Sequence, residues 1–258
     1  MRLVIDIGNT NSVLGLFDSD KELYTWRINT VASSTSDEIR LYLSSLLASV
    51  KLSLEDIHEM VLASVVPSLT DVYTRLAESL KLERFLLVNS ENSANLSFAY
   101  PNPKEVGADR IANAVGAREF YNLPAIVVDF GTATNIDVIS SDGSYMGGCI
   151  SPGLELSTNA LIAKAAKLSS VELKTPAHAI GQSTAEALQS GIILGAAGQI
   201  EGLVARIQKE LKQAGEPVAI VIATGGLAPY ISPVSNIFDV FDPNITVRGL
   251  NAIANFGQ

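Results

Sequence analysis

The feature that most constrains this chain is a strand, turn and strand pattern that occurs twice. Residues 4–11 read VIDIGNTN and residues 127–134 read VVDFGTAT, so Asp6 and Asp129 lie 123 positions apart. In each copy an apolar strand ends at the aspartate, and a glycine then lets the backbone turn tightly and approach a ligand. A carboxylate at such a turn suits a cation, whereas hydroxyls and backbone N–H groups suit an anion.

The likeness extends past the turns. At the same offset Val13 meets Ile136 and Leu16 meets Ile139, and a polar turn follows each second strand. A single Asp-x-Gly turn is ordinary hairpin chemistry. A copy of the whole hairpin indicates an internal repeat, so we expect two similar half-domains whose acidic turns meet at one cleft.

Composition excludes several classes of protein. The net charge of −9 argues against a nucleic-acid partner, which needs clustered Lys and Arg. The single Cys149 fits a reducing cytoplasm, and the two histidines are not spaced for a zinc site or a Ser-His-Asp triad. No uninterrupted apolar stretch reaches the roughly 18 residues of a membrane span, and the N-terminus reads as a strand, so we expect a cytoplasmic protein without membrane contact.

Hydrophobic periodicity predicts alternating strands and helices in both halves. In the first half we expect a hairpin over 2–18, strands at 23–28, 59–66 and 85–88, and helices after the capping residues 33–37 and over 70–80. In the second half we expect a hairpin over 125–139, strands at 145–150 and 218–223, a turn at 151–153, and helices over 156–168, 183–213 and 246–256. This order is typical of α/β layers.

Four glycines recur within the long helical region at 183–213, and each costs about 1 kcal/mol of helix propensity relative to alanine. They are Gly191, Gly195, Gly198 and Gly202. Glycines on a helix let another helix approach closely. The sequence leaves open whether that neighbour lies within the chain or across a dimer or domain interface.

A loop rich in aromatic residues and proline, 92–106, precedes a third candidate acid. Its prolines hold the segment extended, and Gly107-Ala108-Asp109-Arg110 then opens a helical pattern. Asp109 at a helix start has a purely structural explanation, because it can cap the helix or favour its dipole. That explanation leaves Arg110 and the preceding aromatic residues without a role, so both interpretations remain open.

Together these motifs resemble the acetate and sugar kinase, Hsp70 and actin superfamily, in which two such turns contact nucleotide phosphates. A Gly-Gly stretch lies near the adenosine in that superfamily, and Gly225-Gly226 follows a predicted strand here. Within it, five segments resemble the type III pantothenate kinase family: DIGNTN at 6–11, YPNP at 100–103, GADR at 107–110, DFGTAT at 129–134 and GGCISPG at 147–153. The resemblance covers the whole chain. It implies an α/β fold of two actin-like, ribonuclease H-like half-domains, 1–115 and 116–258, each a mixed sheet flanked by helices, with an interdomain cleft.

The resemblance also implies ATP-dependent phosphorylation of pantothenate at its terminal hydroxyl, the first step of coenzyme A biosynthesis. It implies Mg²⁺, a monovalent cation such as K⁺ or NH₄⁺, and a homodimer. By the matching motifs, Asp109 is the general base, Asp6 lies where Mg²⁺ meets the phosphates, and Asp129 holds the monovalent cation. The implied ATP contacts are Asp6, Gly8, Asn9, Thr10, Asn11, Ser12, Val13 and Thr132. The implied pantothenate contacts are Tyr100, Gly107, Ala108, Asp109, Arg110 and, on a less distinctive motif, Thr184.

Elementary chemistry is compatible with these roles. Phosphoryl transfer needs positioning and charge neutralisation, and no Walker A sequence is present, so the two turns must supply them. An aspartate can act as base on an alcohol, and Arg110 can hold a carboxylate bidentately or pair with a neighbouring acid. Two alternatives are a catalytically silent accessory or regulatory relative and a sugar or acetate kinase. The retained aspartates disfavour the first, and the short length and GADR sequence disfavour the second.

Overall fold

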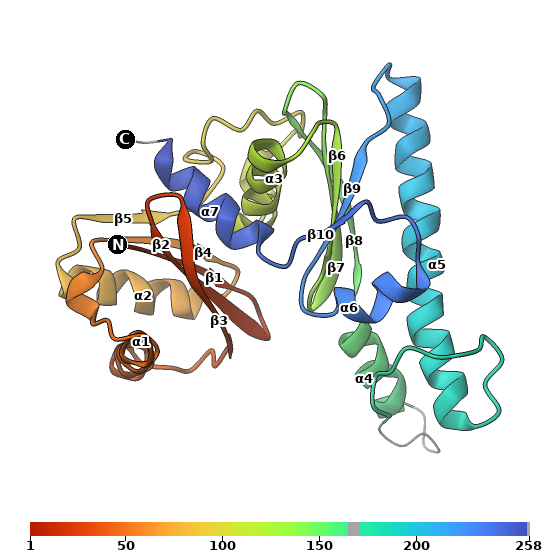
Figure 1. Ribbon diagram of the computed structural model, residues 1–258, viewed down its shortest axis with the longest axis horizontal. Helices are drawn as coiled ribbons and strands as arrows, with labels where there is room; N and C mark the ends of the chain where they lie inside the picture. The colour runs from red at the N-terminus through yellow and green to blue at the C-terminus, as the bar shows by residue number, and fades with distance from the viewer. Residues whose placement is uncertain (165–170, 257–258) are drawn as a thin grey trace. The chain divides into compact units, whose positions relative to one another are not determined.

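The computed structural model describes residues 1–164 and 171–256, and its internal contacts divide the chain into two compact units. Unit 1 is Met1–Phe120 together with the C-terminal segment that starts at Asn244. Unit 2 is Tyr121–Pro243. Each unit contains one five-stranded sheet with helices packed against it (Figure 1).

Unit 1 has the strand order β3-β2-β1-β4-β5, with β1 antiparallel to β2 and parallel to β4. The strands are β1 (Arg2–Ile7), β2 (Asn11–Asp18), β3 (Lys21–Asn29), β4 (Glu59–Ser64) and β5 (Arg84–Leu87). The helices are α1 (Ser36–Ser49), α2 (Pro67–Leu80), α3 (Ala108–Phe120) and α7 (Ile245–Asn255), with 3₁₀ turns at Leu54–Asp56 and Pro103–Glu105.

Unit 2 has the corresponding strand order β8-β7-β6-β9-β10, with β6 antiparallel to β7 and parallel to β9. The strands are β6 (Ala125–Phe130), β7 (Ala133–Ile139), β8 (Tyr145–Pro152), β9 (Ile220–Thr224) and β10 (Val240–Phe241). The helices are α4 (Leu154–Lys164), α5 (Thr184–Gln213) and the short α6 (Ala228–Ile231), followed by a 3₁₀ turn at Ser232–Val234. The predicted repeat is therefore confirmed at the level of sheet topology.

The two hairpins differ by one residue in the turn. Asp6 lies opposite Val13 across β1 and β2, whereas Asp129 lies opposite Asn135 across β6 and β7. The first strands keep the offset of 123 and share one burial pattern. The second strands share their burial pattern at an offset of 122, because the first turn is one residue longer.

The predicted pairing of Val13 with Ile136 and of Leu16 with Ile139 is therefore wrong by one position. Both wrong pairs join apolar residues, so hydrophobicity alone did not reveal the slip. Side chains alternate between the faces of a strand, and a slip of one residue exchanges the two faces. Only the strand register could correct the alignment.

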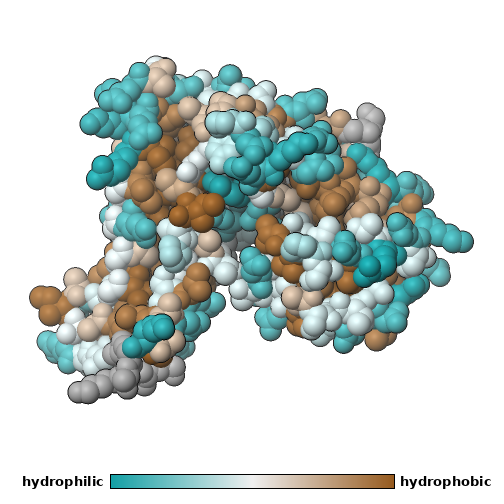
Figure 2. Space-filling view, turned by 180° about the vertical axis from the view of Figure 1, so that it is seen from behind, coloured by the Kyte–Doolittle hydropathy of each residue, from teal (hydrophilic) through white to brown (hydrophobic). Residues whose placement is uncertain are grey.

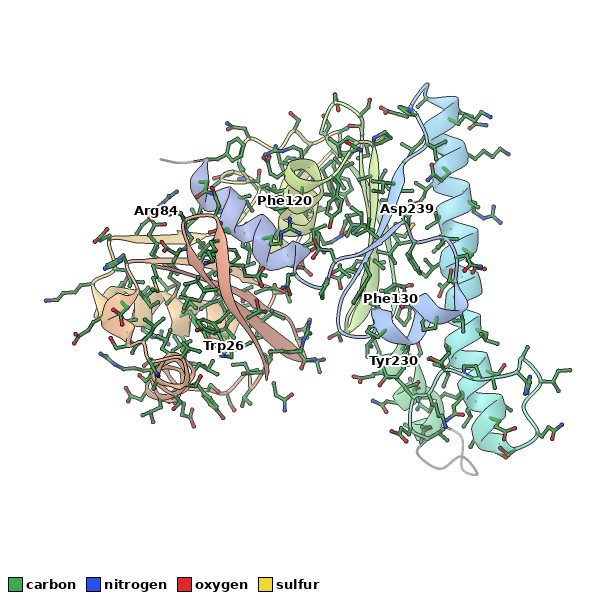
Figure 3. The ribbon with its side chains drawn as sticks, viewed as in Figure 1. Trp26, Arg84, Phe120, Phe130, Tyr230 and Asp239 are labelled. Carbon is green, nitrogen blue, oxygen red and sulfur yellow. The ribbon has the colours of Figure 1, made fainter. Side chains whose placement is uncertain are left out.

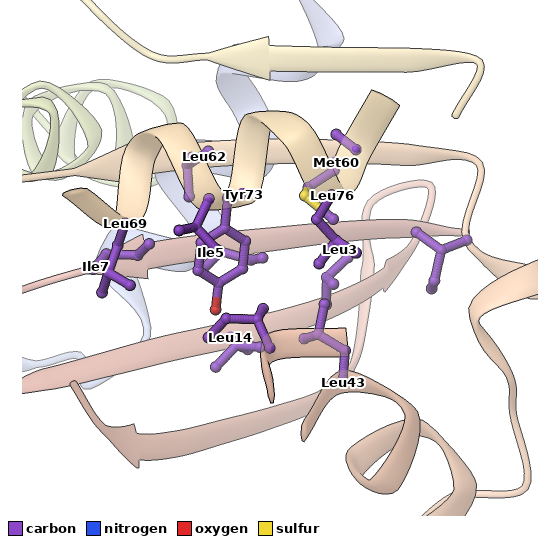
Figure 4. Packing of buried hydrophobic residues seen from close by; sticks show 14 of the residues in the cluster. Leu3, Ile5, Ile7, Leu14, Leu43, Met60, Leu62, Leu69, Tyr73 and Leu76 are labelled. Carbon is purple, nitrogen blue, oxygen red and sulfur yellow. The ribbon is translucent and has the colours of Figure 1, made fainter. Parts of the chain in front are cut away.

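Each unit has its own hydrophobic core. In unit 1, side chains of β1, β2 and β4 pack against α1 and α2, and Figure 4 shows Tyr73 of α2 above Ile5. In unit 2, β6, β7 and β9 pack against one flank of α5 and against α6. Phe130, labelled in Figure 3, ends β6 and packs edge-on against Phe238 with 5.9 Å between ring centroids. Burying an apolar side chain of this size contributes about 1.5–3 kcal/mol to stability.

The structure divides the chain differently from the predicted half-domains, because α7 belongs to unit 1. The buried Arg2 guanidinium donates to the side-chain oxygens of Asn251 at 2.8 Å and Asn255 at 2.7 Å, and it pairs with Glu59 at 2.7 Å. An ideal Cβ on Gly249 would overlap the carbonyl oxygen of Ala112, so α7 crosses α3 backbone against backbone. Helical periodicity predicted α7 but not the sheet it packs on.

Most other element predictions are confirmed, with shifted ends. The predicted boundary at 115/116 falls inside α3, and the predicted turn at 151–153 starts within β8. The predicted extended loop contains a 3₁₀ turn with Pro103 at its first position, where proline has no N–H to satisfy. The predicted helix at 156–168 is seen as α4, and its residues 165–168 lie outside the described residues.

Of the helices that the structure describes, α5 alone has the length and apolar composition that would let it cross a membrane. One flank of α5 is buried in the core of unit 2 through Ile193, Ala197, Ile200 and Val204. A core helix satisfies the same criteria of length and composition.

Candidate active site

The first acidic turn lies at the C-terminal end of β1. The N–H of Gly8 donates to the carbonyl of Asn11 at 3.1 Å, and an ideal Cβ on Gly8 would lie 2.9 Å from that oxygen. The turn is therefore tight enough to require glycine. Asp6 is half-buried, and Asn9 and Thr10 are exposed at the tip.

Two of the predicted ATP contacts, Ser12 and Val13, lie on β2 and differ from each other in burial. Ser12 is buried, and its hydroxyl shares a hydrogen bond of 2.8 Å with the hydroxyl of Thr30. Val13 is half-buried and lies opposite Asp6. The Ser12 side chain thus helps to anchor β2 to β3, and any contact it makes with a nucleotide uses an already engaged hydroxyl.

The second acidic turn lies at the C-terminal end of β6. Gly131 donates its N–H to the carbonyl of Ala133 at 3.0 Å, yet an ideal Cβ on Gly131 would have no atom closer than 3.6 Å. This turn therefore does not need glycine for its own geometry. Asp129 is half-buried and Thr132 is exposed.

Two glycines from other segments of unit 2 lie close against the second turn. An ideal Cβ on Gly153 would overlap the carbonyl oxygens of Gly131 and Thr132, and the Gly153 N–H donates to Thr132 at 3.1 Å. An ideal Cβ on Gly225, whose φ is +90°, would lie 2.5 Å from Asp129 Oδ1. The second turn is thus positioned by residues outside the turn, Gly153 and Gly225.

The third candidate acid, Asp109, lies in the first turn of α3. Burial raises the pKa of its carboxyl, although a hydrogen bond from the Arg110 N–H opposes that effect. An ideal Cβ on Gly107 would lie 2.5 Å from Asp109 Oδ1, so glycine leaves room for this carboxylate. A raised pKa makes a carboxylate a better proton acceptor near neutral pH.

Val65, which follows β4, connects the first turn with the start of α3. Its N–H donates to the carbonyl of Ile7 at 3.0 Å, and its Cγ1 would lie 3.8 Å from a Cβ on Gly107. The ends of the parallel strands β1 and β4 therefore bring Asp6 and Asp109 to the same edge of the unit 1 sheet. The sequence alone did not predict this role of Val65.

The remaining predicted pantothenate contacts fall in two places. Tyr100 and Arg110 are half-buried in unit 1, before and within the start of α3. Thr184 is exposed at the first position of α5 in unit 2, after the cap Ser183, whose hydroxyl accepts from the N–H of Glu186 at 3.2 Å. Helix capping accounts for the local structure of that segment, and Thr184 belongs to unit 2.

The donor atoms at the turns are oxygens. Within the described residues, no group of three or more His, Cys, Asp or Glu side chains forms a metal site. A single carboxylate is nevertheless compatible with Mg²⁺, which is commonly held by one or two carboxylates together with substrate phosphates and water. Asp6 fits this pattern, and Asp129 lies beside main-chain carbonyl oxygens that suit a hard monovalent ion.

Two sheets of corresponding strand order, each with an acidic turn at the end of its central strand, are the architecture of the actin-like fold class. The model of the family described as type III pantothenate kinase matches residues 2–206. A type III pantothenate kinase from Desulfosudis oleivorans is 44% identical over 259 residues and covers 100% of both chains. The chain belongs to the type III pantothenate kinase family.

Solved structures support the fold. A structure from Campylobacter jejuni described as a Baf family transcriptional activator is 21% identical, with a TM-score of 0.62 and coverage of 99% of this chain and 98% of that one. The activator of the 2-hydroxyisocaproyl-CoA dehydratase from Clostridium difficile, solved with bound ADPNP, is 12% identical, with a TM-score of 0.54 and coverage of 99% and 95%. At these identities the comparison shows the fold alone.

Proposed function

We propose that this protein transfers the γ-phosphoryl group of ATP to the terminal hydroxyl of pantothenate, the first step of coenzyme A biosynthesis. The observation that carries the proposal is Asp109, whose carboxylate has a raised pKa and lies at the same sheet edge as the Asp6 turn. A base beside a phosphate-binding turn is what transfer to an alcohol requires.

In the proposed reaction, Asp109 accepts the hydroxyl proton as the oxygen attacks the γ-phosphorus. A new O–P bond forms, the bond between the γ-phosphorus and the bridging oxygen breaks, and ADP leaves with the electron pair. Arg110 binds the carboxylate of pantothenate with two parallel hydrogen bonds. Tyr100, Gly107, Ala108 and Thr184 complete the pantothenate contacts in this proposal.

The two turns bind ATP in this proposal. The backbone and side chains of residues 8–13 contact its phosphates, Thr132 contacts it from the second turn, Asp6 holds Mg²⁺, and Asp129 holds K⁺ or NH₄⁺. Bound cations neutralise negative charge on the phosphoryl oxygens. The position of an ideal Cβ on Gly225 lies 2.5 Å from both Asp129 Oδ1 and the carbonyl oxygen of Phe130, so two oxygen atoms lie close together at the second turn, which supports the cation assignment there.

We propose that the protein is a cytoplasmic homodimer that pairs through α5. An ideal Cβ on any of its four glycines, from Gly191 to Gly202, would meet no atom of the described chain within 4 Å, so packing against that part of the chain does not account for them. Their spacing alternates between four and three residues, as along a seam between two helices. Figure 2 shows hydrophobic residues at the surface among hydrophilic ones. In unit 2, the helix α4 exposes Leu156 and Leu161.

The proposal is tested by measuring ADP release with purified protein, ATP, Mg²⁺ and K⁺, with and without pantothenate. We expect ADP release that depends on pantothenate and a product heavier by one phosphoryl group in the mass spectrum. The control is the same assay with glucose or acetate as acceptor. If ADP is released with glucose or acetate but not with pantothenate, the protein is a sugar or acetate kinase instead. If no acceptor supports turnover, the result favours an accessory protein.

A further inference from the structure

The turn that follows β9 lies directly against the Asp129 carboxylate. Asp129 and Thr224 are register partners on the parallel strands β6 and β9, and Thr224 is buried. The next residue, Gly225, has a φ of +90°, which L side chains rarely adopt. Its bare α-carbon is what allows β9 to end beside the aspartate.

The lack of space at Gly225 and two contacts of Phe130 define this arrangement. A Cβ on Gly225 would lie 2.5 Å from Asp129 Oδ1 and 2.5 Å from the carbonyl oxygen of Phe130. The N–H of Leu227 donates to that same carbonyl at 3.1 Å, which ties the β9–α6 turn to the end of β6. The Phe130 ring is fixed in turn against Phe238. A side chain at position 225 cannot be accommodated without displacing the Asp129 carboxylate or the β6 backbone.

We propose that Gly225 is a positioning residue for the monovalent-cation site, because it sets where the Asp129 carboxylate points. The proposal rests on the cation role of Asp129 proposed above. Gly-Gly turns in this fold class also suit close approach to adenosine, and the cation-positioning role is separate from that function. The proposal predicts that a methyl group at position 225 changes the K⁺ concentration needed for turnover and leaves the affinity for ATP unchanged.

The test compares Gly225→Ala with Gly215→Ala. Gly215 also has a positive φ, +85°, but a Cβ there would meet no atom within 4 Å, so this control introduces the same type of backbone strain away from Asp129. For Gly225→Ala we expect the half-saturating K⁺ concentration for turnover to rise about tenfold or more, with KM for ATP changed less than about twofold. For Gly215→Ala we expect both values to match the wild type.

A second readout does not depend on turnover. A cation that binds the folded state raises the melting temperature as its concentration rises. We expect K⁺ to raise the melting temperature of the wild type and of Gly215→Ala in the presence of a non-hydrolysable ATP analogue, and to raise that of Gly225→Ala much less. In an Asp129→Asn background, Gly225→Ala should have no further effect on the K⁺ response, since interacting positions are not additive.

Three results would overturn the inference. If Gly225→Ala keeps the wild-type K⁺ response in both readouts, Gly225 does not position Asp129. If it raises KM for ATP and leaves the K⁺ response unchanged, the turn serves the nucleotide instead. If the wild type itself does not respond to K⁺, Na⁺ or NH₄⁺, the proposed cation role of Asp129 fails, and the inference fails with it.

Discussion

The two acidic turns of this protein are copies in sequence, but they are held in different ways. In the first turn, Gly8 is required by its own turn, since a Cβ would lie 2.9 Å from the Asn11 carbonyl. In the second turn, Gly131 has room for a Cβ, and the turn is held instead by Gly153 and Gly225. The first turn is defined by local geometry and the second by contacts with distant segments of its unit.

This difference has a functional side. The first turn lies beside Val65 and the start of α3, so it shares its sheet edge with Asp109, the proposed base. The second turn is enclosed by glycines whose α-carbons approach main-chain and carboxylate oxygens. We infer that the first turn serves the chemical step and contacts the ATP phosphates, and that the second holds the monovalent cation and contacts ATP through Thr132.

The largest expected effect comes from Asp109→Asn. This variant tests whether the chemical step takes place at the sheet edge that carries the first turn and Asp109. Loss of a general base costs about 10²–10⁴-fold in rate. We expect kcat to fall by about that factor while the affinity for ATP, measured by equilibrium titration, stays within about twofold of the wild type. A variant with wild-type kcat would remove Asp109 as the base.

The same variant has a predicted effect on stability. Because burial raises the pKa of Asp109 in the folded state, ionisation of this carboxyl opposes folding: the cost is absent below the ordinary value of about 3.9, grows as the pH rises above it, and is complete above the folded-state pKa. We expect Asp109→Asn to melt at or above the wild-type temperature at pH 7–8, and the difference to vanish in acid. For the wild-type enzyme, kcat/KM should fall on the acid side with an inflection above the ordinary aspartate value.

The next effect distinguishes Asp6 from Asp129 by the cation that each is proposed to hold. We expect Asp6→Asn to raise the Mg²⁺ concentration needed for half-maximal turnover by about tenfold or more, which corresponds to about 1.4 kcal/mol of lost binding. Asp129→Asn should change the K⁺ requirement by a similar factor and leave that for Mg²⁺ near the wild-type value. Titrating each cation at saturating levels of the other is the measurement. Equal effects of both variants on both cations would remove the proposed division between the turns.

A smaller effect compares the turn glycines directly. Gly8→Ala should lower the free energy of unfolding by about 1–3 kcal/mol, because its Cβ crowds the Asn11 carbonyl. Gly131→Ala should leave it within about 0.5 kcal/mol, since the site has space and its φ is not positive. Urea unfolding measures both values. Matching losses would show that the two turns are held in the same way.

The smallest expected effect on the fold concerns α5, which has no counterpart of its length in unit 1. Gly198→Ala should stabilise the isolated helix by up to about 1 kcal/mol. In the proposed dimer the added methyl groups meet across the seam, so we expect a weaker self-association constant in sedimentation equilibrium. Glu210→Ala is the control, because Glu210 is exposed on α5 and lies about 120° around the helix from Gly198. Unchanged association in Gly198→Ala would remove the glycine seam as the interface.

Local patterns were enough to predict the strands, the helices and the first turn. Continuous apolar runs located β1 and β6, and the glycine that follows Asp6 predicted a tight turn that the structure contains. Contacts between distant residues could not be predicted in this way. Neither the approach of Gly225 to Asp129 nor that of Val65 to Gly107 leaves a periodic signal, and the one-residue difference between the turns was hidden by apolar neighbours.

The crossing of α7 over α3 has a consequence for how this protein is made. Unit 2 is inserted into unit 1, and the strands of unit 1 leave the ribosome before the helix that completes their packing. Gly249 and the Asn251 that binds Arg2 are translated only after all of unit 2. A nascent chain can therefore fold unit 2 as a unit while α3 still lacks its neighbour. We therefore expect α3, whose first turn contains the proposed catalytic Asp109, to be fully packed only once α7 has been translated, so chains truncated before α7 should lack an ordered Asp109.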